Sequence, residues 1–190
     1  LEHRRQRQMC IRDRYTFFIS PISSTYGISE LFVKATPLAL IAIGLSYCFK
    51  NNIYNIGAEG QLTMGAIFGG GIGILFHDTN AFWLLPLMIF AGAIGGALWG
   101  LIPAILKTKF NTNEILTSLM LVYVALFILD YLVVGPWKDP FGYSFPKSRP
   151  FSESGRMPLL FDGLRVHFGL IITLFLIFVS WFVFSKTIFG

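Results

Sequence analysis

Charge, cysteine and histidine are all scarce in this 190-residue chain. Only 13% of its residues are charged, whereas a typical soluble domain has about 25%. Its two cysteines cannot form the disulfide framework of a small secreted protein, and its three scattered histidines have no metal-ligand spacing. The chain also lacks the G-x-x-x-x-G-K-[ST] motif of an ATP-binding P-loop. These shortages exclude a disulfide-rich domain, a zinc module and a P-loop ATPase, and we expect no metal, cofactor or catalytic residue.

Apolar residues and glycine, by contrast, are abundant. Hydrophobic residues make up 54% of the chain, which contains 20 phenylalanines and 19 glycines. Glycine is more frequent in membrane helices than in soluble ones. The composition therefore indicates a membrane protein in contact with a lipid bilayer, with no room for a large soluble domain.

Five apolar segments have lengths suited to membrane helices. They are roughly residues 31–49, 53–76, 81–106, 115–134 and 168–184. Backbone groups must be satisfied within lipid, so such segments are helices unless they close a barrel. Barrel strands would have half this length and would alternate polar with apolar residues. We therefore expect an all-α fold, a polytopic transmembrane helical bundle of about five spans.

The distribution of lysines predicts the orientation of these spans. Lys50, the pair Lys107 and Lys109, and Lys186 fall in alternate short connections. Short cytoplasmic loops carry an excess of Lys and Arg. We therefore expect these three connections to be cytoplasmic.

The first fourteen residues differ from the rest of the chain. The run Arg4-Arg-Gln-Arg-Gln-Met-Cys-Ile-Arg-Asp-Arg14 resembles the conceptual translation of a transposase-based sequencing adapter. A basic cytoplasmic tail or a targeting segment is the alternative; a signal peptide is excluded because no apolar core follows the arginines directly. We predict that residues 1–14 are not native. Without them, ten basic residues face eight acidic ones, a net charge of +2, and nothing then supports a nucleic-acid partner.

One polar stretch, Asn55-Ile-Gly-Ala-Glu-Gly-Gln61, opens the second apolar segment. A carboxylate and two amides are costly at membrane depth unless they face protein or a water-filled path. Interrupted membrane segments point to solute sites in transporters. We therefore treat Asn55, Glu59 and Gln61 as substrate-path candidates. The alternative is that this septet only caps a helix.

Two sets of glycines recur every four residues. They are Gly65, Gly69 and Gly73 in the second segment, and Gly92, Gly96 and Gly100 in the third. Small residues at this spacing let helix backbones approach closely in a membrane. We expect all six to serve helix packing rather than to contact a solute.

Several motifs together resemble one family. The septet continues into Leu62-Thr-Met-Gly-Ala66, and Gly96-Ala-Leu-Trp-Gly-Leu-Ile-Pro103 and Phe110-Asn-Thr-Asn-Glu-Ile115 follow it. In this order they resemble permease subunits of bacterial ABC importers. The branch they resemble is the nucleoside and simple-sugar branch of the superfamily that includes the ribose and branched-chain amino acid permeases. The resemblance implies a translocation path for a small polar solute, with nucleosides favoured and simple sugars as the alternative.

The resemblance also implies partners and a location. It implies ATP-binding subunits that hydrolyse ATP separately from this chain, a second permease subunit and an extracytoplasmic solute-binding protein. The location would be the bacterial plasma (inner) membrane. Residues 15–190 would then be a partial transmembrane permease domain that lacks a first helix and a C-terminal half.

Two readings from other classes are alternatives to the ABC permease. The closer one is an ion-coupled secondary transporter with Glu59 as its proton carrier. The other is an intramembrane enzyme, which would need clustered catalytic groups. Glu59 and Asp130 are too isolated in the sequence to supply them.

Overall fold

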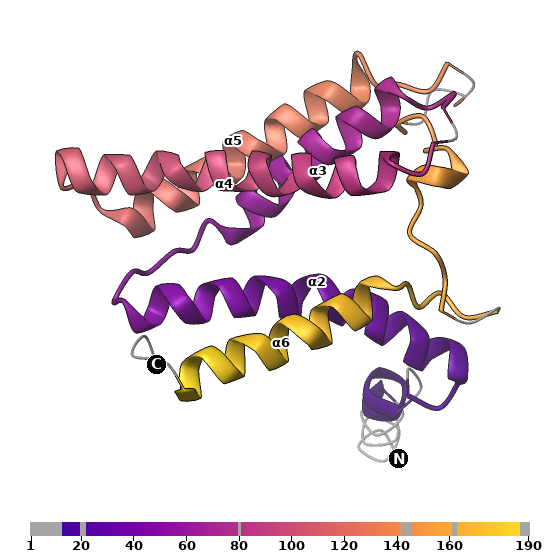
Figure 1. Ribbon diagram of the computed structural model, residues 1–190, viewed down its shortest axis with the longest axis horizontal. Coiled ribbons are helices and arrows are strands. Elements are labelled where there is room, and N and C mark those ends of the chain that lie inside the picture. Colours follow the sequence, from indigo (N-terminus) through magenta and orange to yellow (C-terminus); the bar gives the residue numbers. More distant parts are fainter. Residues whose placement is uncertain are drawn as a thin grey trace, which may run out of the picture. The chain divides into compact units, whose positions relative to one another are not determined.

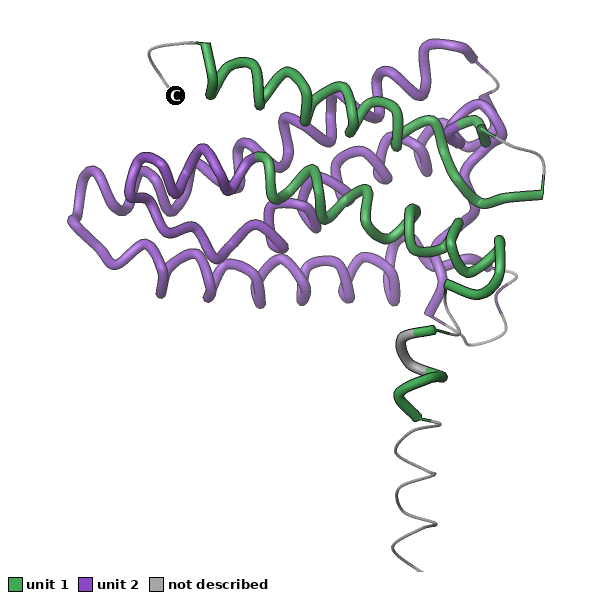
Figure 2. Tube along the Cα trace, turned by 90° about the horizontal axis from the view of Figure 1, so that it is seen from below, with its two compact units in different colours: residues 1–43, 158–190 green, residues 44–157 purple. Residues whose placement is uncertain are grey.

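A computed structural model describes residues 13–19, 22–79, 81–140, 142, 146–160 and 163–186. The chain divides into two compact units, one of Leu1–Ile43 with Pro158–Gly190 and one of Gly44–Met157 (Figure 2). Of the residues that we predicted to be non-native, Asp13 and Arg14 are described and the other twelve lie outside the described ranges.

Five long α-helices form most of the described part of the chain (Figure 1): α2 spans Thr25–Lys50, α3 Ala58–Leu75, α4 Leu84–Phe110, α5 Glu114–Val134 and α6 Gly169–Lys186. Two short helices accompany them, the π-helix η1 at Tyr15–Ile19 and the 3-10 helix η2 at Glu153–Gly155. Two isolated bridges, Lys138 with Ser148 and Leu159 with His167, are the β structure of the described residues. Each predicted apolar segment contains one long helix, so the all-α architecture is confirmed.

Four of these helices, α2, α4, α5 and α6, are long and apolar enough to cross a membrane. The chain is therefore that of a multi-pass membrane protein. These four helices are consistent with the predicted bundle of about five spans, and the remaining long helix is α3. Its 18 residues include Glu59, Gln61 and six glycines, which lower its hydropathy. It packs along α4 and against α5, so much of its surface faces protein.

Three helix boundaries differ clearly from the prediction. The first segment was expected from about residue 31, but α2 already begins at Thr25. The second segment was expected to be helical from residue 53, but α3 begins at Ala58 because the residues before it bond to a side chain of α5 and to each other. The third helix was expected to end near residue 106, but α4 continues to Phe110. There Asn111 adopts the left-handed conformation (φ 50°), and its N–H bonds to the last carbonyls of α4. Lys107 and Lys109 therefore lie in the last turn of α4, where the helix dipole favours positive charge.

The first unit contains η1, most of α2 and α6. Arg165 Nη1 donates to Glu30 Oε1 at 3.0 Å and so ties the segment before α6 to the first turns of α2. Buried hydroxyls in this unit bond to carbonyls of their own helices: Ser29 Oγ donates to Tyr26 O and Thr173 Oγ1 to Gly169 O. These bonds satisfy polar groups that would otherwise be costly to bury.

Close backbone approach defines the contact between α3 and α4 in the second unit. A Cβ built at Gly65 would lie 2.9 Å from Gly92 O, and one at Gly92 would lie 3.1 Å from Gly65 O. A Cβ at Gly69 would lie 2.8 Å from Met88 O, and one at Gly96 would lie 3.1 Å from Gln61 O. At these positions one backbone lies directly against the other, so a side chain at any of them would press on the neighbouring helix.

The remaining two glycines of the two sets face side chains. A Cβ built at Gly73 would lie 2.7 Å from both Met88 Cε and Phe151 Cδ1. A Cβ at Gly100 would lie 2.9 Å from Gln61 Nε2. On the other side of α3, Met64 and Ile67 form a small buried core with Ala125 of α5.

Candidate functional site

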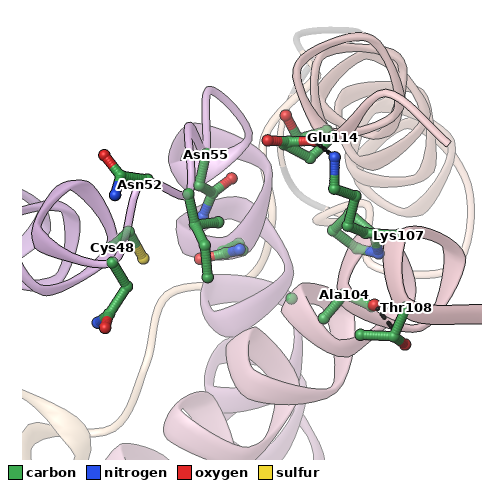
Figure 3. A pocket seen from close by; sticks show the side chains of 13 residues that line it. Cys48, Asn52, Asn55, Ala104, Lys107, Thr108 and Glu114 are labelled. Atoms are coloured by element: carbon green, nitrogen blue, oxygen red, sulfur yellow. Dashed lines mark hydrogen bonds and ion pairs between the residues drawn. The ribbon is translucent and has the colours of Figure 1, made fainter. Parts of the chain in front are cut away.

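A pocket of about 570 Å³ lies within the second unit, where the end of α2, the chain before α3, and the adjoining ends of α4 and α5 meet (Figure 3). This volume is within the range of sites for small organic ligands. Cys48, Pro103 and Ala104 contribute apolar surface to the wall. The surface of the pocket is mainly apolar, and amides, hydroxyls and one ion pair add a small number of varied polar contacts.

The septet reaches this pocket through a short non-helical segment that is fixed at both ends. Asn55 Oδ1 accepts from Gly57 N at 2.9 Å, and Ile56 N donates to Ser118 Oγ of α5 at 3.3 Å. A Cβ built at Gly57 would lie 2.9 Å from Ser118 Cβ and Ser118 O, so this glycine lets the segment lie directly on α5. The chain therefore enters α3 at a defined angle with the Asn55 side chain in the pocket wall.

The three substrate-path candidates divide into two groups in the structure. Asn55 and Gln61 line the pocket, whereas Glu59 does not and is exposed. Glu59 and Gln61 are two positions apart on one helix, which separates them by about 200° around its axis. Gln61 lies on the face that continues through Gly65 and Gly69 against α4. Glu59 lies on another face, and within the described residues its carboxylate has no hydrogen-bond or ion-pair partner.

Four carboxamides line the pocket, and they keep different free groups. Asn51 uses its Nδ2 to donate to Tyr47 O at 2.8 Å, which leaves its oxygen free. Asn55 uses its oxygen, which leaves its Nδ2 free. In the described part of the chain, the side chains of Asn52 and Gln61 make no hydrogen bond, so each has both a donor and an acceptor for a ligand.

An ion pair lies in the wall opposite these amides. Lys107 Nζ of α4 and Glu114 Oε2 of α5 are 2.6 Å apart, and Figure 3 shows the two side chains meeting across the turn between their helices. The Glu114 side chain is only 18% exposed, whereas that of Lys107 is 50% exposed. Asn113 fixes the start of α5, since its side chain accepts from Ile115 N at 3.0 Å.

Sequence reasoning missed this ion pair and the two hydroxyl residues beside it, Thr108 and Ser118. A signal was present: Lys107 and Glu114 have opposite charges and flank a short turn between two apolar segments. A tight turn brings such flanking residues together, so the pair could have been proposed. Ser118 carried no comparable signal.

Metal-ligating side chains were also considered across the described residues. There, no three or more His, Cys, Asp or Glu side chains come together as a metal ion would require. The polar groups of the pocket are suited instead to hydrogen bonding of a small polar molecule.

The comparisons with known proteins agree over most of the chain. Residues 27–190 match the family described as "Branched-chain amino acid transport system / permease component". The glucose ABC transporter permease protein TsgB13 of Haloferax volcanii is 36% identical over 184 residues, which cover 91% of this chain and 48% of that protein. The guanosine ABC transporter permease protein NupP of Bacillus subtilis is 32% identical over 167 residues, which cover 85% of this chain and 47% of that protein.

A third relative, the nucleoside ABC transporter permease protein NupB of Lactococcus lactis, is 28% identical over 180 residues, which cover 91% of this chain and 50% of that protein. The chain thus spans about half the length of these relatives. No solved structure matches it. The family match covers nearly all of α2, the whole of α3 to α6 and every residue of the pocket. The chain therefore belongs to the permease-component family of the branched-chain amino acid transport systems.

Proposed function

We propose that this protein is the membrane-spanning permease subunit of an ABC importer, in which it forms part of the path for a small polar solute. The observation that carries the proposal is the match to permease proteins of ABC transporters over 85% to 91% of the chain. Two of the three relatives above are named for guanosine or nucleosides and one for glucose. Nucleosides are therefore the favoured solutes, with simple sugars second.

The septet supplies the polar groups of the proposed path. Asn55 and Gln61 lie in the pocket wall, and Glu59 lies on the exposed face of the first turn of α3. The first turn of a helix is a favourable place for a negatively charged side chain, because the helix dipole presents its positive end there. We infer that Glu59 faces the path or a neighbouring subunit, while the other two contact the solute from the pocket.

The proposal includes partners that supply energy and solute. Separate ATP-binding subunits would hydrolyse ATP, since the chain lacks a P-loop motif. A second permease subunit would complete the path, and an extracytoplasmic solute-binding protein would deliver the solute. The assembly would lie in the bacterial plasma membrane, with the pocket end of the second unit at the cytoplasmic side because Lys50, Lys107 and Lys109 lie at that end.

Uptake by intact cells tests this proposal. A strain that lacks the gene is complemented with the full-length protein, and accumulation of radiolabelled guanosine and glucose is measured. Complementation should restore uptake of at least one of the two, and depletion of ATP by arsenate should abolish it. Failure to restore either solute contradicts the proposal.

One observation favours a second candidate, the ion-coupled transporter. Glu59 is an exposed carboxylate without a partner in the described residues, as a proton carrier would be. The same uptake assay separates the two mechanisms. A protonophore that leaves cellular ATP unchanged should spare uptake by an ABC importer and should abolish uptake by an ion-coupled transporter.

The role of Glu59 has its own test. Glu59→Gln removes the charge while keeping the size of the side chain, and uptake is measured together with co-purification of the ATP-binding subunits. Reduced uptake with normal assembly is expected for a residue of the path. If both uptake and assembly are unchanged, Glu59 has no role in the path.

A further inference from the structure

We propose that the pocket at the start of α3 binds the hydroxylated ring of a neutral solute, either the ribose of a nucleoside or a free hexose. This inference rests on the import function proposed above and names the solute chemistry of its site. Asn52 and Gln61 would contact the ring with their carboxamides, and Glu114 with its carboxylate. The three residues come from the turn after α2, from α3 and from α5, so they approach a bound ring from different segments of the chain.

Hydrogen-bonding capacity is the first argument. A sugar hydroxyl both donates and accepts, so its best partners are groups that do the same. The Asn52 and Gln61 carboxamides each have a free donor and a free acceptor in the described chain. Asn51 adds a free carboxamide oxygen, because its NH₂ group bonds to the backbone. Asn55 adds a free NH₂ group, because its oxygen bonds to the backbone. The pocket surface is mainly apolar, and within it these groups supply donors and acceptors for neighbouring hydroxyls.

The fixed carboxylate is the second argument. Lys107 Nζ holds Glu114 Oε2 at 2.6 Å, which orients the carboxylate in the pocket wall. A carboxylate has about four acceptor sites, so Glu114 keeps capacity for hydroxyl donors after it binds Lys107. Hydrogen bonds to an ionised acceptor are roughly twice as strong as neutral ones.

Charge balance is the third argument, and it excludes other solutes. Lys107 and Glu114 are the oppositely charged residues of the lining, and they neutralise each other. A phosphate would meet the carboxylate of Glu114 wherever it reached Lys107. An amino-acid zwitterion would have to break the pair to match both of its charges. A charged ligand would therefore leave a charge without a partner in the pocket, and such a cost is an effective means of rejecting a wrong ligand. The pocket thus selects neutral solutes.

Room for the Gln61 carboxamide is provided by a glycine. A Cβ at Gly100 would lie 2.9 Å from Gln61 Nε2, so only a residue without a side chain at this position leaves the amide in its present place. The glycine at position 100 is therefore part of the pocket as well as of the α4 surface. This links the helix-packing pattern to the proposed site.

Cys48 offers a direct readout because it lies in the same pocket wall and is a free thiol. The experiment uses full-length protein in detergent, in a variant whose only cysteine is Cys48, and follows its alkylation by N-ethylmaleimide. Guanosine, glucose, 2′,3′-dideoxyguanosine, leucine and guanosine monophosphate are tested as protectants. A solute at ten times its Kd leaves about one tenth of the pockets free, so alkylation should slow about tenfold.

Guanosine, glucose or both should protect Cys48, whereas the other three solutes should not. Protection by guanosine alone assigns the ring to a nucleoside, and protection by glucose alone assigns it to a hexose. Equal protection by dideoxyguanosine would show that binding does not depend on the ring hydroxyls. Equal protection by leucine or the monophosphate would show that the pocket does not select neutral solutes. Either result overturns the inference.

Two variants test the assigned residues. Gln61→Leu should raise the concentration needed for half-protection about tenfold, because an amide that both donates and accepts is lost from the pocket wall. Thr63→Val, on the same helix but outside the lining, is the matched control and should leave protection unchanged. Glu114→Gln removes the counter-charge of Lys107 and should allow the monophosphate to protect. Wild-type protection in Gln61→Leu, or continued exclusion of the monophosphate in Glu114→Gln, contradicts the assignment.

Uptake measured in parallel separates this inference from the proposed function. Uptake of guanosine or glucose without any protection of Cys48 overturns the pocket assignment and leaves the importer intact. Protection without uptake has the opposite meaning, because it supports the pocket and contradicts the importer.

Discussion

Replacing Gly69 with alanine places a methyl group against the backbone of α4, and the two helices can then no longer keep their separation. The added Cβ would lie 2.8 Å from Met88 O and 3.6 Å from Met88 C, whereas ordinary contacts are 3.4 to 4 Å. Met88 O belongs to a helix backbone and cannot rotate away. The backbones must therefore move apart by roughly 0.6 Å, and overpacking of this kind costs about 1–3 kcal/mol.

The intrinsic helix preference of alanine acts in the opposite direction and has to be separated out. Alanine is favoured over glycine by about 1 kcal/mol in a helix interior. Gly44→Ala in α2 is the matched control, because a Cβ there meets nothing within 4 Å. The free energy of unfolding of Gly69→Ala should thus fall below that of Gly44→Ala by about 1–3 kcal/mol.

Reversible unfolding in mixed micelles, followed by tryptophan fluorescence, measures this difference. Trp99 packs on the buried cluster between α3 and α5 and should report the loss of that packing. Gly92→Ala gives a graded comparison, since its Cβ would lie 3.1 Å from Gly65 O, a milder conflict. Equal stability of Gly69→Ala and Gly44→Ala, or a larger loss at Gly92 than at Gly69, would refute the close-packing argument.

Three further predictions concern other parts of the structure. Asn113→Ala removes the N-cap of α5 and should cost about 1 kcal/mol, with faster amide hydrogen exchange at Ile115 as the local sign; unchanged exchange contradicts the cap. Gly100→Ala should reduce solute uptake while changing the free energy of unfolding little, because its Cβ meets the mobile end of Gln61, and full uptake in this variant argues against that displacement. Arg165→Ala should leave the thermal unfolding temperature unchanged, because its ion pair with Glu30 lies at the surface; a clear decrease would show that the pair stabilises the first unit.

The sequence predicted the helices well because membrane segments follow a strict physical rule. Lipid offers no hydrogen bonds, so an apolar run of sufficient length must satisfy its own backbone as a helix. All five expected segments contain a long helix for this reason. The predicted helices differ from the observed ones at their ends, because local hydrogen bonds determine where a helix begins and where it stops. Ser118 and Asn55 keep the chain before Ala58 out of a helix, and Asn111 extends α4 past Lys109.

The candidate site was only partly predictable. Asn55 and Gln61 were chosen because polar groups are unusual in an apolar run, and both line the pocket. Glu59 was chosen for the same reason, yet it lies on another face of α3. A residue's face depends on where its helix begins and on which side packs against neighbours. The spacing of four between Gln61 and Gly65 was the signal in the sequence that would have separated Gln61 from Glu59.

By itself, the sequence determined the membrane class, the helical segments and the family, because composition, segment length and motif order are properties of a linear chain. The tertiary structure decided which polar groups meet. It joins Gln61 of α3 to Lys107 of α4 and Glu114 of α5 around one pocket, and it leaves Glu59 outside. The physical reason is that close packing of glycines fixes the rotation of α3 against α4, and that rotation directs each side chain.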